Sequence, residues 1–341
     1  MNYQNLQLFG VAEIEETHNG IKFYRYPQKV IESLGVPEYD KNGNFIQNYK
    51  GHKLAANACV GMEIRFVYDG TCAQITFYCE KSATFMAFVG DYQIGYYMLS
   101  AGESTIEITR PNNSFGVKEG SCNRYSMNLW RIVPECDLPI TLVRLTVNEG
   151  NYRLPKENER TTMLVYGSSI SQGCGTPFAT MNYLNIAANL LGWDIKNKAI
   201  AGGCFCETSV RDFLLNEAFD CAYFELGTNI ANRPLQMIEE RVGTFIATMA
   251  TAFPQKTIYL MTPITGLSDV SITAEEYATY FANTKLVIEK YGKRYKNVVL
   301  LDGHALLDKD YYLSADILHP SAFGHVMMGI NLAEMIKNSK K

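Results

Sequence analysis

The sequence has 341 residues, which is enough for two domains. Its composition, 47% hydrophobic and 19% charged residues, excludes a disordered chain. Its formal net charge is −4 and no Lys/Arg cluster is interleaved with aromatic residues, which argues against a nucleic-acid partner. No apolar run reaches the ~18 residues of a transmembrane helix, and the N-terminus lacks a secretion signal, so we expect a cytoplasmic protein with no membrane partner.

The nine cysteines are scattered irregularly along the chain. An odd, irregular set is typical of reduced thiols rather than of a disulfide framework. Only Cys204 and Cys206 lie close together, and zinc or redox motifs prefer a Cys-x-x-Cys spacing. We therefore expect small side chains that line a loop and no metal site.

The first half of the sequence shows the apolar–polar alternation of half-buried strands. Turn signals such as Asp69-Gly70 separate the alternating stretches, and one short helix is expected at residues 27–35. Several short strands without a long helical pattern are typical of a β-sandwich or jelly roll. The polar stretch 149–160 contains Gly and Pro and separates two compositions, which predicts an all-β domain over residues 1–155 and a second domain over 156–341. The alternating stretches are 62–68, 73–78, 104–108 and 140–147.

In the second half, nearly continuous apolar strands alternate with helical patterns. This arrangement predicts a parallel sheet covered on both faces. Five strands predict a flavodoxin-like, three-layer α/β/α domain, whose functional sites lie at the carboxyl ends of the strands. The expected strands are 163–166, 195–200, 221–226, 258–261 and 298–301, and the helices are 178–191, 237–253, 275–291 and 321–336.

Hydrogen-bond donors follow the first three of these strands. Ser169 lies at the first strand-to-helix turn, Gly202 follows the second strand and Asn229 follows the third. Taken singly, the serine fits a helix cap, the glycine a tight turn and the asparagine a side chain that closes its own loop. Together, the Ser169 and Gly202 backbone N–H groups and the Asn229 amide supply the three donors that a tetrahedral oxyanion requires.

A carboxylate precedes a histidine by three residues after the fifth strand. Asp316 can therefore hold the imidazole of His319 in the tautomer and orientation that a serine nucleophile needs. A histidine before a proline is also common as an ordinary loop residue. His304, two residues after Asp302, is the rival base, and His325 in the last helix is expected to pack or to face solvent.

These residues resemble the signature of the SGNH, or GDSL-type, serine esterases and acylhydrolases over residues 160–338. The four blocks of that signature are matched, in order, by Ser169, Gly202, Asn229 and His319.

Two positions depart from the family pattern. Ser168 stands where the family usually has aspartate before the nucleophile, and Ile230 stands where it usually has aspartate directly after the asparagine. Neither departure changes a group in direct contact with the reacting carbonyl, so we expect activity to survive. The departures leave open how the serine turn and the asparagine loop are supported.

A β-sandwich ahead of such a domain resembles the two-domain carbohydrate acetyl esterases and related acyltransferases. The resemblance implies an acylated oligosaccharide as substrate. Residues 262–266 follow the fourth strand, so we expect them to form another wall of the site. Four aromatic residues either stack on sugars or pack as ordinary strand residues. They are Tyr92, Tyr96, Tyr97 and Trp130.

The leading hypothesis is hydrolysis of a small acyl ester, acetyl foremost, through a Ser169–His319–Asp316 triad and an acyl-enzyme, with no cofactor or metal. The alternatives are an acyltransferase to a sugar or small-molecule hydroxyl and a catalytically silent carbohydrate-binding protein. A nucleotide-binding flavodoxin-like protein is disfavoured because the P-loop lysine and the glycine fingerprint are missing. The sequence indicates neither the sugar nor the oligomeric state.

Overall fold

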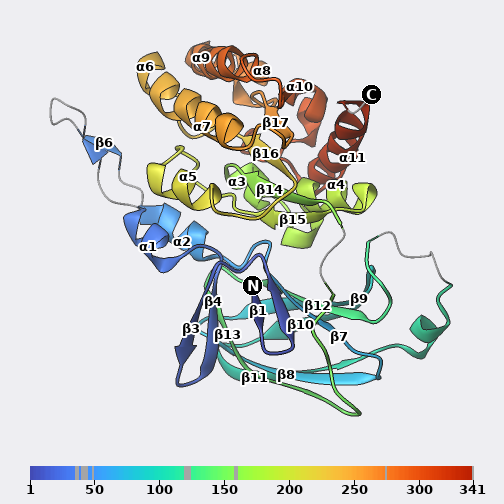
Figure 1. The fold of residues 1–341 in the computed structure, drawn as a ribbon. Helices are drawn as coiled ribbons and strands as arrows, with labels where there is room; N and C mark the ends of the chain where they lie inside the picture. The colour runs from blue at the N-terminus through green and yellow to red at the C-terminus, as the bar shows by residue number, and fades with distance from the viewer. Residues whose placement is uncertain are drawn as a thin grey trace. The chain divides into compact units, whose positions relative to one another are not determined.

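The computed structural model describes residues 1–34, 38–39, 45–47, 50–118, 124–156, 160–272 and 275–339. The chain forms two units (Figure 1). One comprises Met1–Ile31 and Ala56–Arg160, and the other comprises Glu32–Ala55 and Thr161–Lys341. Residues 32–55, which the predicted boundary assigns to the first domain, therefore group with the second unit.

The first unit contains two antiparallel sheets, as the alternating sequence pattern predicts. One sheet has the order β1-β2-β7-β12-β9-β10 and the other β11-β8-β13-β4-β3. The rings of Phe77 and Phe85, one from each sheet, stack with centroids 4.2 Å apart inside a shared core. The strands are β1 Asn2–Tyr3, β2 Leu6–Phe9, β3 Glu13–Thr17, β4 Gly20–Tyr24, β7 Glu63–Val67, β8 Cys72–Cys79, β9 Ala83–Val89, β10 Tyr92–Leu99, β11 Gly102–Thr109, β12 Leu129–Glu135 and β13 Ile140–Val147.

Two of the four aromatic residues considered for sugar stacking belong to this core. Trp130 is fully buried and donates its indole N–H to the Tyr68 carbonyl, and Tyr97 packs against the same cluster. A sugar-stacking role is wrong for Trp130, because a ring enclosed by its own sheets presents no face to a ligand. Tyr97 is only half-buried, and stacking on sugars stays a prediction for it. Tyr92 and Tyr96 are 43% and 44% exposed, and stacking on sugars stays a prediction for them.

The second unit has a five-stranded parallel sheet in the order β15-β14-β16-β17-β18, as predicted. Helices cover both faces because consecutive strand residues point to opposite sides. Tyr223 contacts Tyr183 of α4, whereas Phe224 contacts Phe245 of α7. In Figure 1, α4 and α11 lie on one side of this sheet and α7 and α9 on the other. The strands are β14 Thr162–Tyr166, β15 Asp194–Asn197, β16 Cys221–Glu225, β17 Ile258–Met261 and β18 Val298–Leu301.

The helices follow the predicted order, with two differences. The first predicted helix begins later, because Asn182 caps α4 by accepting the Asn185 N–H. The second contains the π-helical turn η3 between α6 and α7. The principal helices are α3 Ser169–Gln172, α4 Tyr183–Leu191, α5 Thr208–Leu214, α6 Leu235–Ile238, η3 Glu239–Gly243, α7 Thr244–Ala252, α8 Leu267–Val270, α9 Glu275–Gly292, α10 Gly303–Leu306 and α11 Ala322–Ser339.

Residues 32–55 of this unit also carry short elements. The helix expected at residues 27–35 is α1, Gln28–Ser33, and α2 spans Lys50–Asn57. The two-stranded pair β5 Glu38–Tyr39 and β6 Phe45–Gln47 lies between them in the sequence. The remaining short helices are η1 Asn112–Gly116 in the first unit and η2 Ala179–Met181 and η4 Asp310–Tyr312 in the second.

Among the described residues, no helix combines the length and the apolar character needed to cross a bilayer. A cytoplasmic location stays a prediction. The eight cysteines in the described part of the chain are free thiols.

Candidate active site

The turn after β14 brings Ser169 to the start of a short helix. Ser168 has extended backbone angles and caps α3 by accepting the Ile170 N–H at 3.3 Å. Ser169 is the first helical residue and is 7% exposed. At Gly167, a Cβ atom would lie 2.5 Å from the Ser171 Oγ, so the turn leaves no space for a side chain there.

His319 lies between Ser169 and Asp316. Its Nε2 is 2.8 Å from the Ser169 Oγ, and its Nδ1 is 2.6 Å from Asp316 Oδ2. The other oxygen of Asp316 accepts the backbone N–H groups of Leu318 and His319 at 3.1 and 3.0 Å. Chiefly because of the hydrogen bond from His319, the pKa of Asp316 falls to about 2. The carboxylate is thus ionised and directs the imidazole toward the serine hydroxyl.

A tight loop between η4 and α11 sets the position of this pair. Leu313 and Pro320 form an antiparallel bridge, and the Ser314 N–H donates to the His319 carbonyl at 2.7 Å. Between them, Ile317 adopts a φ of +54° and packs against the apolar core. A β-branched residue rarely occupies this left-handed region, so the anchored ends of the loop and the contacts of the half-buried side chain must hold it there. The resulting turn directs Asp316 back onto its own backbone.

The loops with Gly202 and Asn229 contact each other and the serine helix. Asn229 donates one amide hydrogen to the Gly203 carbonyl at 2.8 Å. A side-chain amide has two hydrogens, so a second one remains for a ligand. The Ala201 N–H donates to Gln172 of α3 at 2.6 Å. The three sequence blocks that were expected to supply oxyanion donors therefore lie side by side.

The glycine loop has an unusual backbone. Gly202, Cys204 and Cys206 all have positive φ values, between +56° and +68°. For the two cysteines this conformation is strained, so surrounding contacts must stabilise it. Their burial raises the pKa of both thiols well above the usual value, which makes them poor nucleophiles and metal ligands.

One of the stabilising contacts comes from His52, which the sequence analysis missed. Its ring stacks on Phe205 at 5.3 Å and it hydrogen bonds to the Gly202 backbone. Burial lowers the pKa of His52 to about 4, so the ring is neutral near pH 7. No spacing rule connects a residue in the first sixth of the chain to the glycine loop, and no sequence signal could have identified it.

A second residue was also missed. Glu225 ends β16 and is 2% exposed, and its carboxylate accepts hydrogen bonds from the serine turn. The signal was present, because it is the charged residue in an otherwise apolar or aromatic strand at residues 221–226.

The rival histidines take other partners. His304 is half-exposed, and its Nε2 lies 3.2 Å from an oxygen of Asp269, while Asp302 caps α10. His325 is buried, so it packs in the interior, which is one of the two expectations for it. It accepts the Tyr183 N–H at 3.3 Å and donates to the Cys174 carbonyl at 2.9 Å. Of these histidines, only His319 is paired with Ser169.

Residues 262–266 lie beside the loop that carries His319. Thr265 donates to the Leu307 carbonyl at 2.7 Å, and a Cβ atom on Gly266 would lie 3.6 Å from the Ile317 carbonyl oxygen. This location is compatible with the wall predicted for the stretch, and its contact with substrate stays a prediction.

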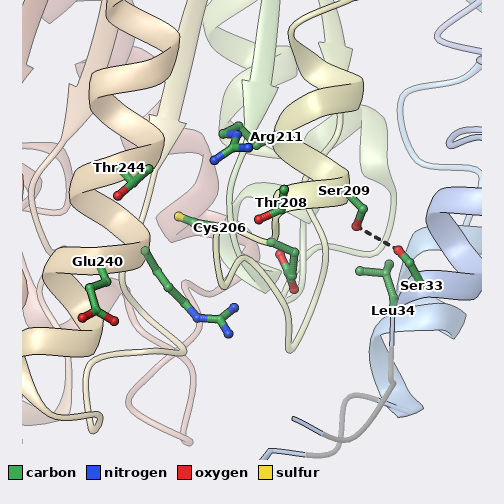
Figure 2. Close-up of a pocket in the computed structure, with 10 residues that line it drawn as sticks. Ser33, Leu34, Cys206, Thr208, Ser209, Arg211, Glu240 and Thr244 are labelled. Atoms are coloured by element: carbon green, nitrogen blue, oxygen red, sulfur yellow. Dashed lines mark hydrogen bonds between the residues drawn. The ribbon is translucent and has the colours of Figure 1, made fainter. Parts of the chain in front are cut away.

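A cavity of about 470 Å³ opens beyond the glycine loop (Figure 2). The Ser33 hydroxyl donates to that of Ser209 at 2.8 Å on one side of it. Ser169 and His319 lie outside its lining. The lining residues are Ser33, Leu34, Cys206, Glu207, Thr208, Ser209, Arg211, Glu240, Arg241 and Thr244.

Comparisons with known proteins agree with this architecture. Residues 160–337, more than half of the chain, match the GDSL-like Lipase/Acylhydrolase family. No curated protein matches the sequence. A salicylyl-acyltransferase from a tetracycline biosynthetic pathway has a similar structure, with a TM-score of 0.79 at 15% identity over 98% of this chain and 95% of that one.

Two carbohydrate esterases share the fold as well. One is a family two carbohydrate esterase from Clostridium thermocellum, solved in complex with cellohexaose, with a TM-score of 0.61 and 15% identity over 98% of this chain and 99% of that one. The other is an acetyl xylan esterase from the rumen bacterium Butyrivibrio proteoclasticus, with a TM-score of 0.56 and 12% identity over 100% and 96% of the two chains. At identities this low, the structural similarity establishes a common fold for the β-rich unit and the α/β unit and nothing further.

Proposed function

Because the chain belongs to the GDSL-like lipase/acylhydrolase family, we propose that it is a serine esterase that removes small acyl groups, acetyl foremost, from carbohydrates. One observation carries the proposal: hydrogen bonds join Asp316, His319 and Ser169 in series, at 2.6 and 2.8 Å. This is the order that a serine nucleophile, its general base and the group that orients the base require.

In the proposed reaction, His319 Nε2 takes the Ser169 proton as the Oγ attacks the acyl carbonyl. Asp316 keeps the proton of His319 on Nδ1 and stabilises the imidazolium that forms. The imidazolium then donates its proton to the departing alcohol, which leaves an acyl-serine. Water, activated by His319 in turn, releases the carboxylic acid and restores the serine hydroxyl.

The negative charge that develops on the carbonyl oxygen needs donors in place. We assign this role to the backbone N–H groups of Ser169 and Gly202 and to the free hydrogen of the Asn229 amide. The hydrogen bond from the Asn229 amide to the Gly203 carbonyl supports the assignment because it fixes the direction of that amide. Losing one such donor typically lowers turnover by about 100- to 1000-fold.

Carbohydrate as the alcohol component is supported by the fold shared with carbohydrate esterases. A panel of acetylated xylo-, gluco- and manno-oligosaccharides, with p-nitrophenyl acetate as a general substrate, tests the proposal. The wild-type protein is expected to release acetate, and Ser169→Ala is expected to abolish release. Ser209→Ala, a serine at the start of α5, is the matched control and should be fully active. Undiminished activity of Ser169→Ala, or sugar binding without any turnover, would contradict the proposal.

An acyltransferase is the second candidate, because the structure with a TM-score of 0.79 is an acyltransferase. The same acyl-enzyme would then be resolved by a sugar or small-molecule hydroxyl instead of water. Analysis of products in the presence of increasing concentrations of alcohols separates the two. A transferase forms a new ester at the expense of free acid, whereas an esterase gives acid at an unchanged rate.

A further inference from the structure

The carboxylate of Glu225 is the acceptor for several donors beneath the serine turn. Its Oε2 accepts the Ser168 N–H at 2.8 Å, the Ser168 hydroxyl at 2.7 Å and the Ser171 hydroxyl at 3.0 Å. Its Oε1 accepts the Thr228 hydroxyl at 2.6 Å. A single side chain, 2% exposed, thus collects four hydrogen bonds.

These donors connect the loops of the candidate site. Ser168 and Ser171 flank the nucleophile on either side, and Thr228 immediately precedes Asn229. The backbone carbonyl of Glu225 also accepts the Cys204 thiol of the glycine loop at 3.5 Å. Movement of this one residue would therefore displace the serine turn, the glycine loop and the asparagine loop together.

The surroundings of Glu225 are those of a carboxylate in its ionised form. The four donors are neutral N–H and O–H groups, and a carboxylate that accepts on both oxygens has no proton to donate. Burial raises the pKa of Glu225, while the hydrogen bonds from Thr228, Ser168 and Ser171 oppose that shift. Gly167 makes the close approach possible, because a Cβ atom there would lie 2.9 Å from Glu225 Oε2.

We propose that Glu225 is a positioning residue for Ser169: its carboxylate fixes the serine turn so that the hydroxyl stays within reach of His319 and the asparagine loop stays beside it. This inference rests on the proposed function. It also answers the doubt raised by the departure at position 168, where the family usually has aspartate. In this chain Ser168 is itself held by a carboxylate, which comes from the neighbouring strand.

Glu225→Gln tests the role with little change of shape. The amide oxygen can keep the bonds from Ser168, and the Thr228 hydroxyl can rotate to accept from the amide nitrogen, so the fold is retained. The negative charge is lost, however, and the hydrogen bonds that hold the serine turn are weakened because they are no longer charge-assisted. Misplacement of a reacting group by about 1 Å costs roughly 100-fold in rate. We expect kcat for p-nitrophenyl acetate to fall by about 10- to 100-fold with KM changed less than about threefold, when rates are divided by the active sites that a fluorophosphonate titrates.

The matched control is Glu217→Gln. Glu217 is another carboxylate of the same unit, with its side chain only 12% exposed, and it binds Lys196 at 2.9 Å. Its loss should lower the melting temperature without changing kcat per titrated site. If Glu225→Gln lowers only the melting temperature in the same way, Glu225 is merely structural and the inference is overturned.

A second variant keeps the inference testable if the Glu225→Gln protein does not fold. Thr228→Val keeps the shape of the side chain and removes only the bond to Oε1, and we expect kcat to fall by about 3- to 10-fold. An unchanged kcat for Thr228→Val, with Glu225→Gln unfolded, also overturns the inference. If the wild-type protein neither reacts with the fluorophosphonate nor hydrolyses esters, the proposed function fails first and takes this inference with it. Normal wild-type activity with unaffected variants refutes the role of Glu225 alone.

Discussion

Substitution of Asp316 by asparagine should impair turnover more than substitution by alanine. One oxygen of Asp316 accepts two backbone N–H groups, and the other accepts the Nδ1 proton of His319. An asparagine must keep its single oxygen on the backbone donors, so its NH₂ group faces His319 Nδ1. The imidazole then carries its proton on Nε2, where it meets the Ser169 hydroxyl and cannot act as a base.

The expected losses of kcat differ between the two substitutions because of the exposure of the Asp316 side chain. A wrong tautomer costs on the order of 10,000-fold in a serine protease triad, and we expect at least about 1,000-fold for Asp316→Asn. In Asp316→Ala, water can bind His319 Nδ1, because the Asp316 side chain is 51% exposed. The loss is then one charge-assisted hydrogen bond, about 1.5–3 kcal/mol, or roughly 10- to 150-fold in kcat.

Steady-state hydrolysis of p-nitrophenyl acetate by the three proteins measures this difference. His304→Gln is the control, since that half-exposed histidine pairs with Asp269 and should be dispensable. Equal losses for Asp316→Asn and Asp316→Ala, or a smaller loss for asparagine, would refute the tautomer argument.

Three further results are expected. Gly227→Ala should destabilise the protein by about 3 kcal/mol or more in urea, since φ is +99° and the new Cβ would lie 2.0 Å from Thr284 Cγ2; a variant of wild-type stability would contradict this. Glu63→Gln should lower the free energy of unfolding by about 3 kcal/mol, because the carboxylate accepts from two buried arginines: from Arg65 at 2.8 Å, and from Nε and Nη2 of Arg131 at 2.7 Å each. An unshifted urea midpoint would show the network to be unimportant. The pKa of Asp316 lies near 2 in the folded protein against a usual 3.8, so its contribution to stability is present above that usual value and is lost as pH falls toward 2. Between pH 3.8 and 2, the melting temperature of Asp316→Ala should therefore fall less than that of the wild-type protein. An identical fall in the two proteins would argue against a stabilising interaction between Asp316 and His319.

The fold could be predicted from the sequence because each half has one dominant periodicity. Alternation in the first half fixes which residues face the core, and the continuous apolar strands of the second half require helices on both faces. What periodicity could not supply is the grouping of residues 32–55 with the second unit, since that depends on contacts such as His52 on Phe205. It also could not show that Trp130 is enclosed, because an aromatic residue in a strand fits a core and a ligand platform equally well.

The site residues were predictable where the chemistry of a side chain suggested a role and its place after a strand indicated its location. Parallel strands bring their carboxyl ends to one edge, so Ser169, Gly202 and Asn229 could be expected together, and the spacing of Asp316 and His319 implied a shared loop. Their catalytic roles stay predictions. Glu225 could be noticed as the charged residue of an apolar strand, but its contacts could not be predicted, because an acid at the end of a strand usually faces water. Only the three-dimensional arrangement shows it buried among hydroxyl groups.

The central claim is that His319 activates Ser169 as a nucleophile. Mass spectrometry of the protein after brief exposure to a fluorophosphonate probe tests it most directly. The account predicts one adduct, on the peptide that contains Ser169, and a labelling rate that falls by at least about 100-fold in His319→Gln. An adduct on another residue, or labelling of Ser169 that does not depend on His319, would contradict it.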